Sequence, residues 1–536
     1  MKFEQYAFPS RRSNVFGRHG LVATSQPLAA QAGLAILQAG GNAIDAAIAT
    51  VATLCVVEPC STGIGGDAFA LIWVAKEQKL YGINASGPAP RQLTADYVRS
   101  QGHQEMPGLG ALTVTVPGSL RGWQLALERW GSLGLDRLLA QPIDYASKGF
   151  PVSQRIARAW QRSREKMSEH PDSMRVWVPG GRTPRAGDLF RNPEFAHTLR
   201  ALAENGYNAF YSGPIAEEIV ACVRAAGGLL ALDDLADYQA EWVEPISSHW
   251  GNYTFYEIPP NGQGLTALLA LNIARGFDLP TLGHGTADYY HALMEAIKLA
   301  FADAAAYIAD PRQAEIPLAA LLSHSYASKR RALIEMERAL TPHAGNPSRH
   351  GDTVYLTVAD EAGNMVSWIQ SLYMGFGSGL TAGTTGVQLQ NRGANFNLQP
   401  GHPNEAAGGK RPYHTIIPGF ISHQGQAWCS FGVMGGFMQP QGHLQVGLNL
   451  VEFGMDPQTA LDAPRFNWLH DKTFALENGI EPPVRQELAR RGHRLLSPDD
   501  ALAQHYGGGQ VIVRDPDSGV LFGGSEPRND GMAVGW

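Results

Sequence analysis

The sequence predicts a globular protein that combines helices with β-strands, and three observations predict it. Apolar residues make up 44% and charged residues 17% of the 536 residues, which is typical of a chain with an ample core. Helical apolar spacing alternates with short strand-like runs in the first third of the chain. A clear period-two alternation begins at Thr353. A typical domain has ~150 residues, so a chain of this length would contain three or four domains. Large α/β sandwiches of the same length nevertheless form one unit.

The helical elements are predicted from apolar spacing and from their caps. Residues 25–57 have helical spacing that breaks at Gly40, and Asn42 is placed to cap the following helix, AIDAAIATVATLCVV. A glycine-rich turn at 61–67 and a strand-like run, AFALIWVA, come next. Residues 150–250 are predicted to be mainly helical. The best amphipathic helix spans 288–310 and stops before a proline.

A β-hairpin is predicted after a polar loop. Residues 339–349 show no periodicity and predict an exposed loop. The run 353–359 alternates with period two, 360–364 has turn chemistry, and 365–371 alternates again. A strand that starts directly after a loop, with a threonine at its first position, is the most informative local feature of the sequence.

Charge and composition limit the function classes. The net charge of −7, without a basic run, predicts no nucleic-acid partner. No apolar run reaches the ~18 residues of a membrane span, and the first residues have no apolar signal segment. The four cysteines, Cys55, Cys60, Cys222 and Cys429, lack metal-ligand spacing. We therefore expect a cytoplasmic protein with no membrane association, no metal and no cofactor.

Most standard catalytic motifs are absent from the sequence. It has no G-x-S-x-G elbow, no H-E-x-x-H and no P-loop. His291 and Glu295 could share one helix face as metal ligands, but no further ligands cluster with them, so a packed or solvated pair is favoured. On sequence alone the pairs Gly65-Gly66 and Gly435-Gly436 are turn glycines.

Several weak signals nevertheless fall in one order across residues 20–536. The chain resembles the gamma-glutamyltransferase family of N-terminal-nucleophile hydrolases, which mature by cutting themselves. The matching motifs, in order, are GGNAIDAA, EPCSTGIGGDAFA, MEAIKLAFADAAAYIADP, GDTVYLTVADEAGNMVS, FGSGL, KRP, MGGFMQPQGH, ALDAPRF and SEPRNDG. The resemblance implies an α+β fold, a four-layer αββα sandwich. It also implies a hydrolase of linear amide C–N bonds.

The resemblance implies self-cleavage between Asp352 and Thr353. Residues 1–352 would form a large subunit and 353–536 a small one, together one catalytic domain and a heterodimer. The freed Thr353 would have an α-amino group with a pKa near ~7.7–8.0, so one residue supplies both nucleophile and base. By resemblance, Gly435 and Gly436 contribute amides to an oxyanion hole, and Ser371 matches a threonine whose hydroxyl bonds the nucleophile.

The substrate pocket departs from the family pattern in charge type. Tyr373 replaces an asparagine, Arg392 a glutamine, Asn395 an aspartate and His414 a serine. The family's Arg-Glu before Ala-Pro is replaced here by a Ser-Gly pair. The groups that hold the amino and carboxylate groups of a glutamyl substrate are therefore lost. Arg392, Tyr373 and His414 instead offer donors to a small anionic substrate that has no amine.

This pattern is similar to a family subgroup that includes oxamate amidohydrolase, which converts oxamate to oxalate and ammonia. The best prediction is therefore a cytoplasmic catabolic enzyme that hydrolyses a small anionic amide. One alternative is a glutathione hydrolase or γ-glutamyltransferase with an altered pocket. Another is an unprocessed, catalytically silent binding protein; the retained Thr353, Ser371 and glycine pair argue against it.

Overall fold

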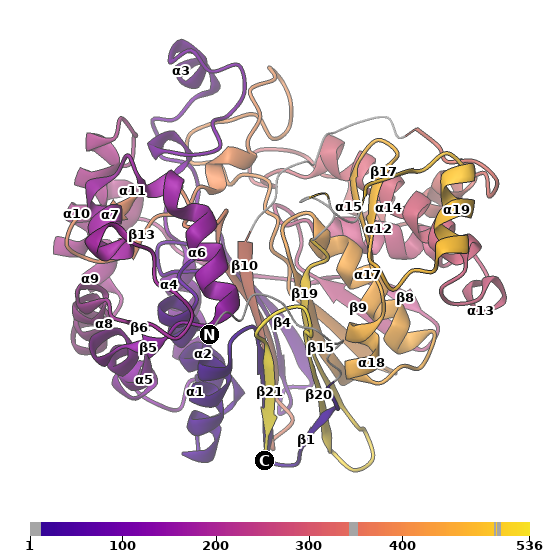
Figure 1. The fold of residues 1–536 in the computed structure, drawn as a ribbon, viewed down its shortest axis with the longest axis horizontal. Coiled ribbons are helices and arrows are strands. Elements are labelled where there is room, and N and C mark those ends of the chain that lie inside the picture. Colours follow the sequence, from indigo (N-terminus) through magenta and orange to yellow (C-terminus); the bar gives the residue numbers. More distant parts are fainter. Residues whose placement is uncertain (1–11, 342–351, 498–499, 501–504) are drawn as a thin grey trace.

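Two β-sheets lie face to face in the middle of the molecule, and helices cover both outer faces (Figure 1). The computed structural model describes residues 12–341, 352–497, 500 and 505–536. This is the predicted α+β, four-layer αββα sandwich, and that prediction is confirmed. Both sheets belong to one body, so the estimate of three or four domains from length was too high.

Each sheet has seven antiparallel strands. The first contains, in spatial order, β21 (Met532–Gly535), β2 (Gly20–Thr24), β10 (Asp352–Asp360), β11 (Met365–Tyr373), β3 (Asp67–Val74), β4 (Lys79–Ala85) and β7 (Glu241–Val243). The second contains β1 (Val15–Gly17), β20 (Leu521–Ser525), β19 (Gly508–Arg514), β15 (Gln426–Met434), β14 (Gly419–His423), β9 (Tyr253–Glu257) and β8 (Ile246–Trp250). Both sheets contain strands from before and from after residue 353.

The interior between the sheets is apolar. Phe69, Tyr355 and Ile369 of the first sheet pack against Phe420 and Ile512 of the second, and all five side chains are buried. Burial of side chains of this size supplies most of the stabilisation of such a sandwich. The central strand β10 is thereby held at a fixed depth, which fixes the position of its first residues.

The helices pack in two groups. The first sheet is covered by α1 (Pro27–Gln38), α2 (Ala43–Val57) and α4 (Ser119–Trp130), with α5 (Leu135–Lys148) and α8 (Pro193–Asn205) outside them. The second sheet is covered by α12 (Gly264–Ala274), α14 (Ala287–Tyr307), α17 (Met438–Val451) and α18 (Pro457–Asp462). Among the helices of the described residues, none has the length and apolar character that crossing a membrane requires.

The elements predicted from local pattern are confirmed. Asn42 caps α2 in a capping box with Asp45, whose Oδ2 accepts a 3.0 Å bond from the Asn42 amide. The predicted hairpin is β10 and β11, and the amphipathic helix is α14. The helical prediction for 150–250 holds as far as α11 (Leu232–Ala236), after which β7 and β8 follow. Only residues 339–341 of the predicted loop lie within the described residues.

Candidate active site

Thr353 lies at an irregularity near the start of the central strand. The β10–β11 register shifts between Asp352 and Val354, so Thr353 falls at the shift. Such irregularities change the direction of a side chain and are frequent beside active sites. The Thr353 side chain is almost fully buried, and its Oγ1 donates a 3.2 Å hydrogen bond to Ser371 Oγ.

Ser371 is itself held by the backbone around it. Its Oγ accepts a 2.7 Å hydrogen bond from the Tyr373 amide. Gly66 lies against its carbonyl: a Cβ added at Gly66 would be 2.3 Å from the Ser371 oxygen. Only glycine permits this close approach. The glycine-rich turn before β3 therefore helps to set the position of the hydroxyl that meets Thr353.

The glycine pair follows the end of β15 and faces the same site. Gly435 has φ 133° and Gly436 has φ 60°, both in the region that disfavours side chains. Gln263 Nε2 donates a 2.8 Å bond to the Gly436 carbonyl, which fixes the peptide plane. Within the described residues neither glycine amide donates to another group. Two unused N–H groups in a rigid turn can bind a developing oxyanion.

A buried guanidinium, that of Arg392, packs on the ring of Tyr373. Arg392 belongs to the 3₁₀ turn Arg392–Asn395 and is fully buried. Its Nη1 donates a 2.7 Å bond to Thr415 Oγ1, and its guanidinium carbon lies 4.4 Å from the centre of the Tyr373 ring. Its Nε and Nη2 have no partner among the described residues. Burial lowers the pKa of Arg392 to about 10, still well above neutral pH.

Asp67 and His414 complete this buried cluster. His414 Nε2 lies 3.0 Å from Asp67 Oδ2, and the other carboxylate oxygen accepts bonds of 2.9 Å each from Gln390 Nε2 and the Gly87 amide. Burial raises the pKa of Asp67 to about 7, although the charge of Arg392 opposes this shift. Burial also lowers the pKa of His414 well below its usual value. The imidazole is therefore neutral at physiological pH.

The predicted residues thus fall into two adjoining groups. Thr353 bonds Ser371 and lines one cavity with Gly435, and Tyr373 links Ser371 to Arg392 through its amide and its ring. Asn395 ends the turn that Arg392 begins; its carbonyl accepts a 2.7 Å bond from Asn404, and its Nδ2 is buried without a partner in the described chain. Asp67 was not predicted as a site residue, although it closes the glycine-rich turn at 61–67 that precedes the strand.

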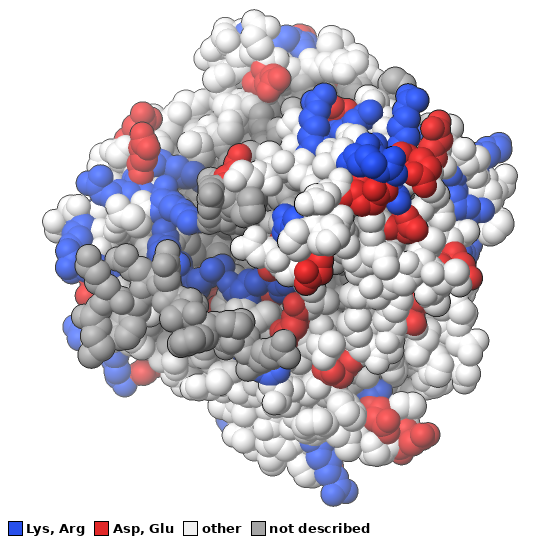
Figure 2. Space-filling model, turned by 45° about the vertical axis from the view of Figure 1, so that its right-hand side comes forward, with Lys and Arg blue, Asp and Glu red and all other residues white. Residues whose placement is uncertain are grey.

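A cavity of about 780 Å³ opens beside Thr353. Thr353 and Gly435 line it, whereas Arg392, Tyr373 and His414 do not. Three arginines of α6 (Gln154–Met167), Arg155, Arg158 and Arg162, also line it. Figure 2 shows Lys and Arg side chains reaching into a hollow near the centre of the face drawn there.

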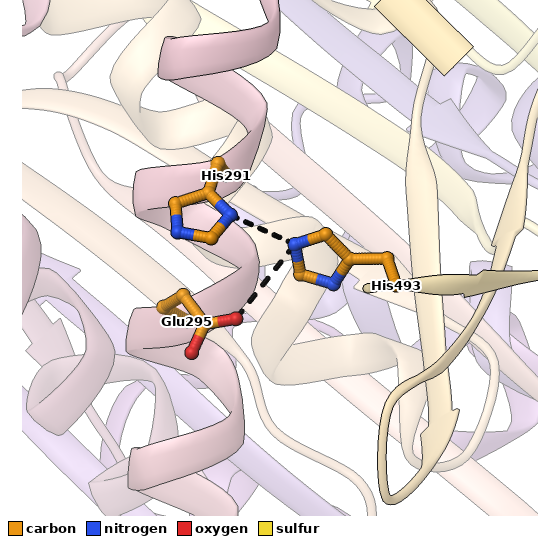
Figure 3. A group of neighbouring side chains, drawn as sticks. All are labelled: His291, Glu295 and His493. Atoms are coloured by element: carbon orange, nitrogen blue, oxygen red, sulfur yellow. Dashed lines mark hydrogen bonds and ion pairs between the residues drawn. The ribbon is translucent and has the colours of Figure 1, made fainter. Parts of the chain in front are cut away.

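A separate buried cluster surrounds His291 of α14. His291 Nδ1 lies 2.8 Å from His493 Nε2, which is 3.7 Å from Glu295 Oε1 (Figure 3). Burial lowers the pKa of both histidines, so both rings are neutral. Lys298 Nζ lies 2.5 Å from the same Glu295 oxygen and would repel a metal ion there. The geometry therefore favours the packed interpretation of His291 and Glu295, to which the structure adds Lys298 and His493.

A threonine at the start of a central strand of an αββα sandwich, with a hydroxyl partner and a free amide pair, defines the N-terminal-nucleophile class of amide hydrolases. The chain belongs to the gamma-glutamyltranspeptidase family, whose model matches residues 29–536. The resemblance inferred from the motifs is therefore confirmed.

Known proteins similar to this chain have different activities in their names. The glutathione hydrolase-like YwrD proenzyme of Bacillus subtilis is 37% identical, over 97% of this chain and 99% of its own. The oxamate amidohydrolase proenzyme of Klebsiella pneumoniae is 35% identical, over 98% and 99%. The crystal structure of cephalosporin acylase from Bacillus halodurans is 48% identical, covers 100% of this chain and 99% of its own, and superimposes with a TM-score of 0.94. The shared coarse function is hydrolysis of an amide bond.

Proposed function

We propose that this protein is a self-processing threonine amidohydrolase of small amides that bear a carboxylate beside the scissile bond. The best candidate substrate is oxamate, which the enzyme would convert with water to oxalate and ammonia. The reaction needs no metal and no cofactor in this mechanism. One observation carries the substrate proposal: the buried Arg392 has Nε and Nη2 without partners among the described residues and packs on the ring of Tyr373, whose amide bonds Ser371.

Thr353 would be the nucleophile of both self-cleavage and hydrolysis. A threonine hydroxyl is a weak nucleophile at its own pKa and needs an adjacent base. Cleavage of the Asp352–Thr353 bond would free an α-amino group on the same residue to act as that base. Ser371 Oγ would orient the attacking oxygen, and the amides of Gly435 and Gly436 would bind the oxyanion.

The two fragments would remain together as a heterodimer. In the first sheet, β10 and β11 of the proposed small subunit lie between β2 and β3 of the large one. The second sheet likewise joins β14 and β15 of the small subunit to β8 and β9 of the large one, through the β14–β9 pair. Cutting one peptide bond leaves these ladders and the shared core intact, so residues 1–352 and 353–536 would form one catalytic domain.

The pocket chemistry supports an anionic acyl group without an amine. Nε and Nη2 form one edge of the guanidinium, and two parallel N–H groups match a carboxylate. Buried donors without partners are unfavourable, so an anion that accepts hydrogen bonds from them binds with a favourable free energy. The Tyr373 ring would form one side of the pocket, and the neutral His414 would offer hydrogen bonds without a charge. Asn395 stands where glutamyl enzymes have the aspartate that pairs with the substrate amine. The Klebsiella relative is named for oxamate, which supports this assignment.

Glutathione hydrolysis is the second candidate, because the Bacillus subtilis relative is named for it. Ammonia release by the purified, processed protein would separate the two. We expect a kcat/KM for oxamate well above that for γ-glutamyl amides. A preference for γ-glutamyl-anilide would overturn the oxamate assignment and support the glutathione hydrolase.

A further inference from the structure

One face of α6 forms a row of arginines on the wall of the cavity beside Thr353. Arg155, Arg158 and Arg162 are spaced three and four residues apart, so they lie on one side of the helix. All three are exposed and line the cavity. The opposite side of the helix is anchored by Trp160, whose Nε1 donates a 2.8 Å bond to the Trp177 carbonyl. The row therefore faces the cavity because the core fixes the rotation of the helix.

Two of these guanidinium groups have no carboxylate to offset them. Arg155 donates a 2.8 Å bond to Asn529 Oδ1 and lies near the charge of Asp530. Arg528, on the far wall, is bound by Glu477, with an Nη2–Oε2 distance of 2.6 Å. In the described part of the chain Arg158 and Arg162 have no ion pair. The lining holds four arginines and three carboxylates, Glu58, Glu477 and Asp530, so a positive charge remains in the cavity beside Thr353.

The place of this cavity relative to Arg392 determines which part of a substrate it holds. Thr353 takes part in both surroundings: its hydroxyl bonds Ser371, which Tyr373 links to Arg392, and Thr353 also lines the cavity, which Arg392 does not. In an amide the acyl group and the amine portion lie on opposite sides of the scissile C–N bond. If the acyl carboxylate binds Arg392, the amine must project into the cavity.

We infer that Arg158 and Arg162, with Arg155 beside them, bind an anionic group on the amine portion of the substrate. The inference rests on the proposed function and extends its substrate class from oxamate to oxalyl amides whose amine carries a carboxylate, such as oxalyl amino acids and oxalyl dipeptides. A volume of about 780 Å³ is much larger than the ammonia released from oxamate requires. A guanidinium row suits a carboxylate because each group donates two parallel hydrogen bonds.

The chemistry for such substrates has the same two steps as for oxamate. Thr353 Oγ1 attacks the amide carbon, its proton passes to the α-amino group, and the C–N bond breaks as that proton moves to the leaving amine. Water then hydrolyses the oxalyl ester and regenerates the hydroxyl. The arginines act on binding and release of the amine portion and touch no bond that breaks.

Matched substrates test the inference with the processed enzyme. The probes are oxamate, N-oxalylglycine and N-oxalylglycylglycine, together with the C-terminal amides of the last two. Each acid differs from its amide only in the distal charge. We expect the acid to exceed its amide at least tenfold in kcat/KM for one or both pairs, mainly through KM.

Variants of the arginine row show whether it causes the preference for the acid over the amide. Arg158→Gln/Arg162→Gln should reduce the acid-over-amide ratio to within twofold of one; because each ratio compares two oxalyl compounds, a general effect of the lost charges on both cancels. Arg164→Gln is the control, because Arg164 is exposed on the same helix and does not line the cavity. Equal rates for acid and amide in the wild type, or a ratio that the double variant leaves unchanged, would overturn the inference alone. No hydrolysis of any of the five oxalyl compounds would overturn the proposed function and the inference with it.

Discussion

The side-chain hydroxyl of Thr353 donates a hydrogen bond of 3.2 Å to the hydroxyl of Ser371 on the neighbouring strand. Ser371 Oγ also accepts from the Tyr373 amide, so its position is set by backbone on one side and meets Thr353 on the other. The bond holds the Thr353 hydroxyl in one orientation. The relationship gives the first prediction.

Ser371→Ala should lower kcat about threefold to tenfold, because one net hydrogen bond contributes about 0.5–1.5 kcal/mol. Ser371→Thr restores a hydroxyl at the same place and should keep most of the activity. Steady-state kinetics on fully processed protein make the comparison. Equal activity of the alanine and threonine variants would remove Ser371 from the site.

Gly436→Ala should lower turnover by about 10²–10³-fold, which is typical of the loss of one oxyanion donor. The φ of 60° disfavours a side chain, and the shift needed to accommodate one would misplace the amide. Gly425→Ala is the control: its φ is 81°, it lies in the β14–β15 turn and nothing lies within 4 Å of an added Cβ.

Both glycine variants should lose stability in thermal unfolding, and only Gly436→Ala should lose turnover per folded, processed molecule. If the two variants lost activity in the same proportion as stability, Gly436 would be a turn glycine and the oxyanion hole would lie elsewhere.

Arg392→Ala should lower kcat/KM for oxamate by about one to two orders of magnitude, because charge-assisted hydrogen bonds contribute about 1.5–3 kcal/mol each. Arg392→Lys keeps the charge and loses the paired donor edge, so it should recover only part of this loss. Self-cleavage should proceed in both variants because it involves no free substrate. Unchanged oxamate kinetics in the alanine variant would assign Arg392 to fold stability alone.

The KM for oxamate should rise as the pH increases through about 7, the pKa to which burial raises Asp67. Below this pH Asp67 is neutral and leaves the charge of Arg392 free for the substrate; above it the carboxylate offsets that charge. The His414 imidazole, which faces Asp67, stays neutral over this range because burial lowers its pKa well below the usual value. Protonation of the Thr353 amine lowers kcat at low pH, so the two effects separate in kcat and KM.

Asp67→Asn should flatten the pH dependence of KM and leave that of kcat in place. A wild-type KM that is constant across neutral pH, or one that falls as the pH rises, would contradict this role of Asp67.

Local patterns were enough to predict the elements on which the site is built. The Asn42 cap, the helix α14 and the β10–β11 hairpin each depend on residues within one short segment, and the structure has all three. The hairpin brings Thr353 and Ser371 onto neighbouring strands, and the pairing of their hydroxyls was expected from the resemblance. The αββα sandwich and the place of the glycine pair in the site were predicted from the resemblance of motifs, because the periodicity of one segment does not determine them.

Long-range relationships were out of reach of the sequence. His414 meets Asp67 across 347 positions, and no single spacing joins them. His493 meets His291 in the same way, from a strand edge far along the chain. For the stretch that contains the arginines of α6 the sequence predicted only helix, because the cavity that they line also depends on Thr353 and on residues 527–530, which lie far along the chain.

The central claim is that Thr353 becomes the N-terminal nucleophile, and intact-mass analysis of the purified protein tests it most directly. The account predicts two fragments, residues 1–352 and 353–536, with threonine at the new N-terminus. Thr353→Ala should remain one chain and be inactive, because it has no hydroxyl for the acyl shift or for attack on the amide. A single, uncleaved chain of 536 residues that hydrolyses amides would contradict the account.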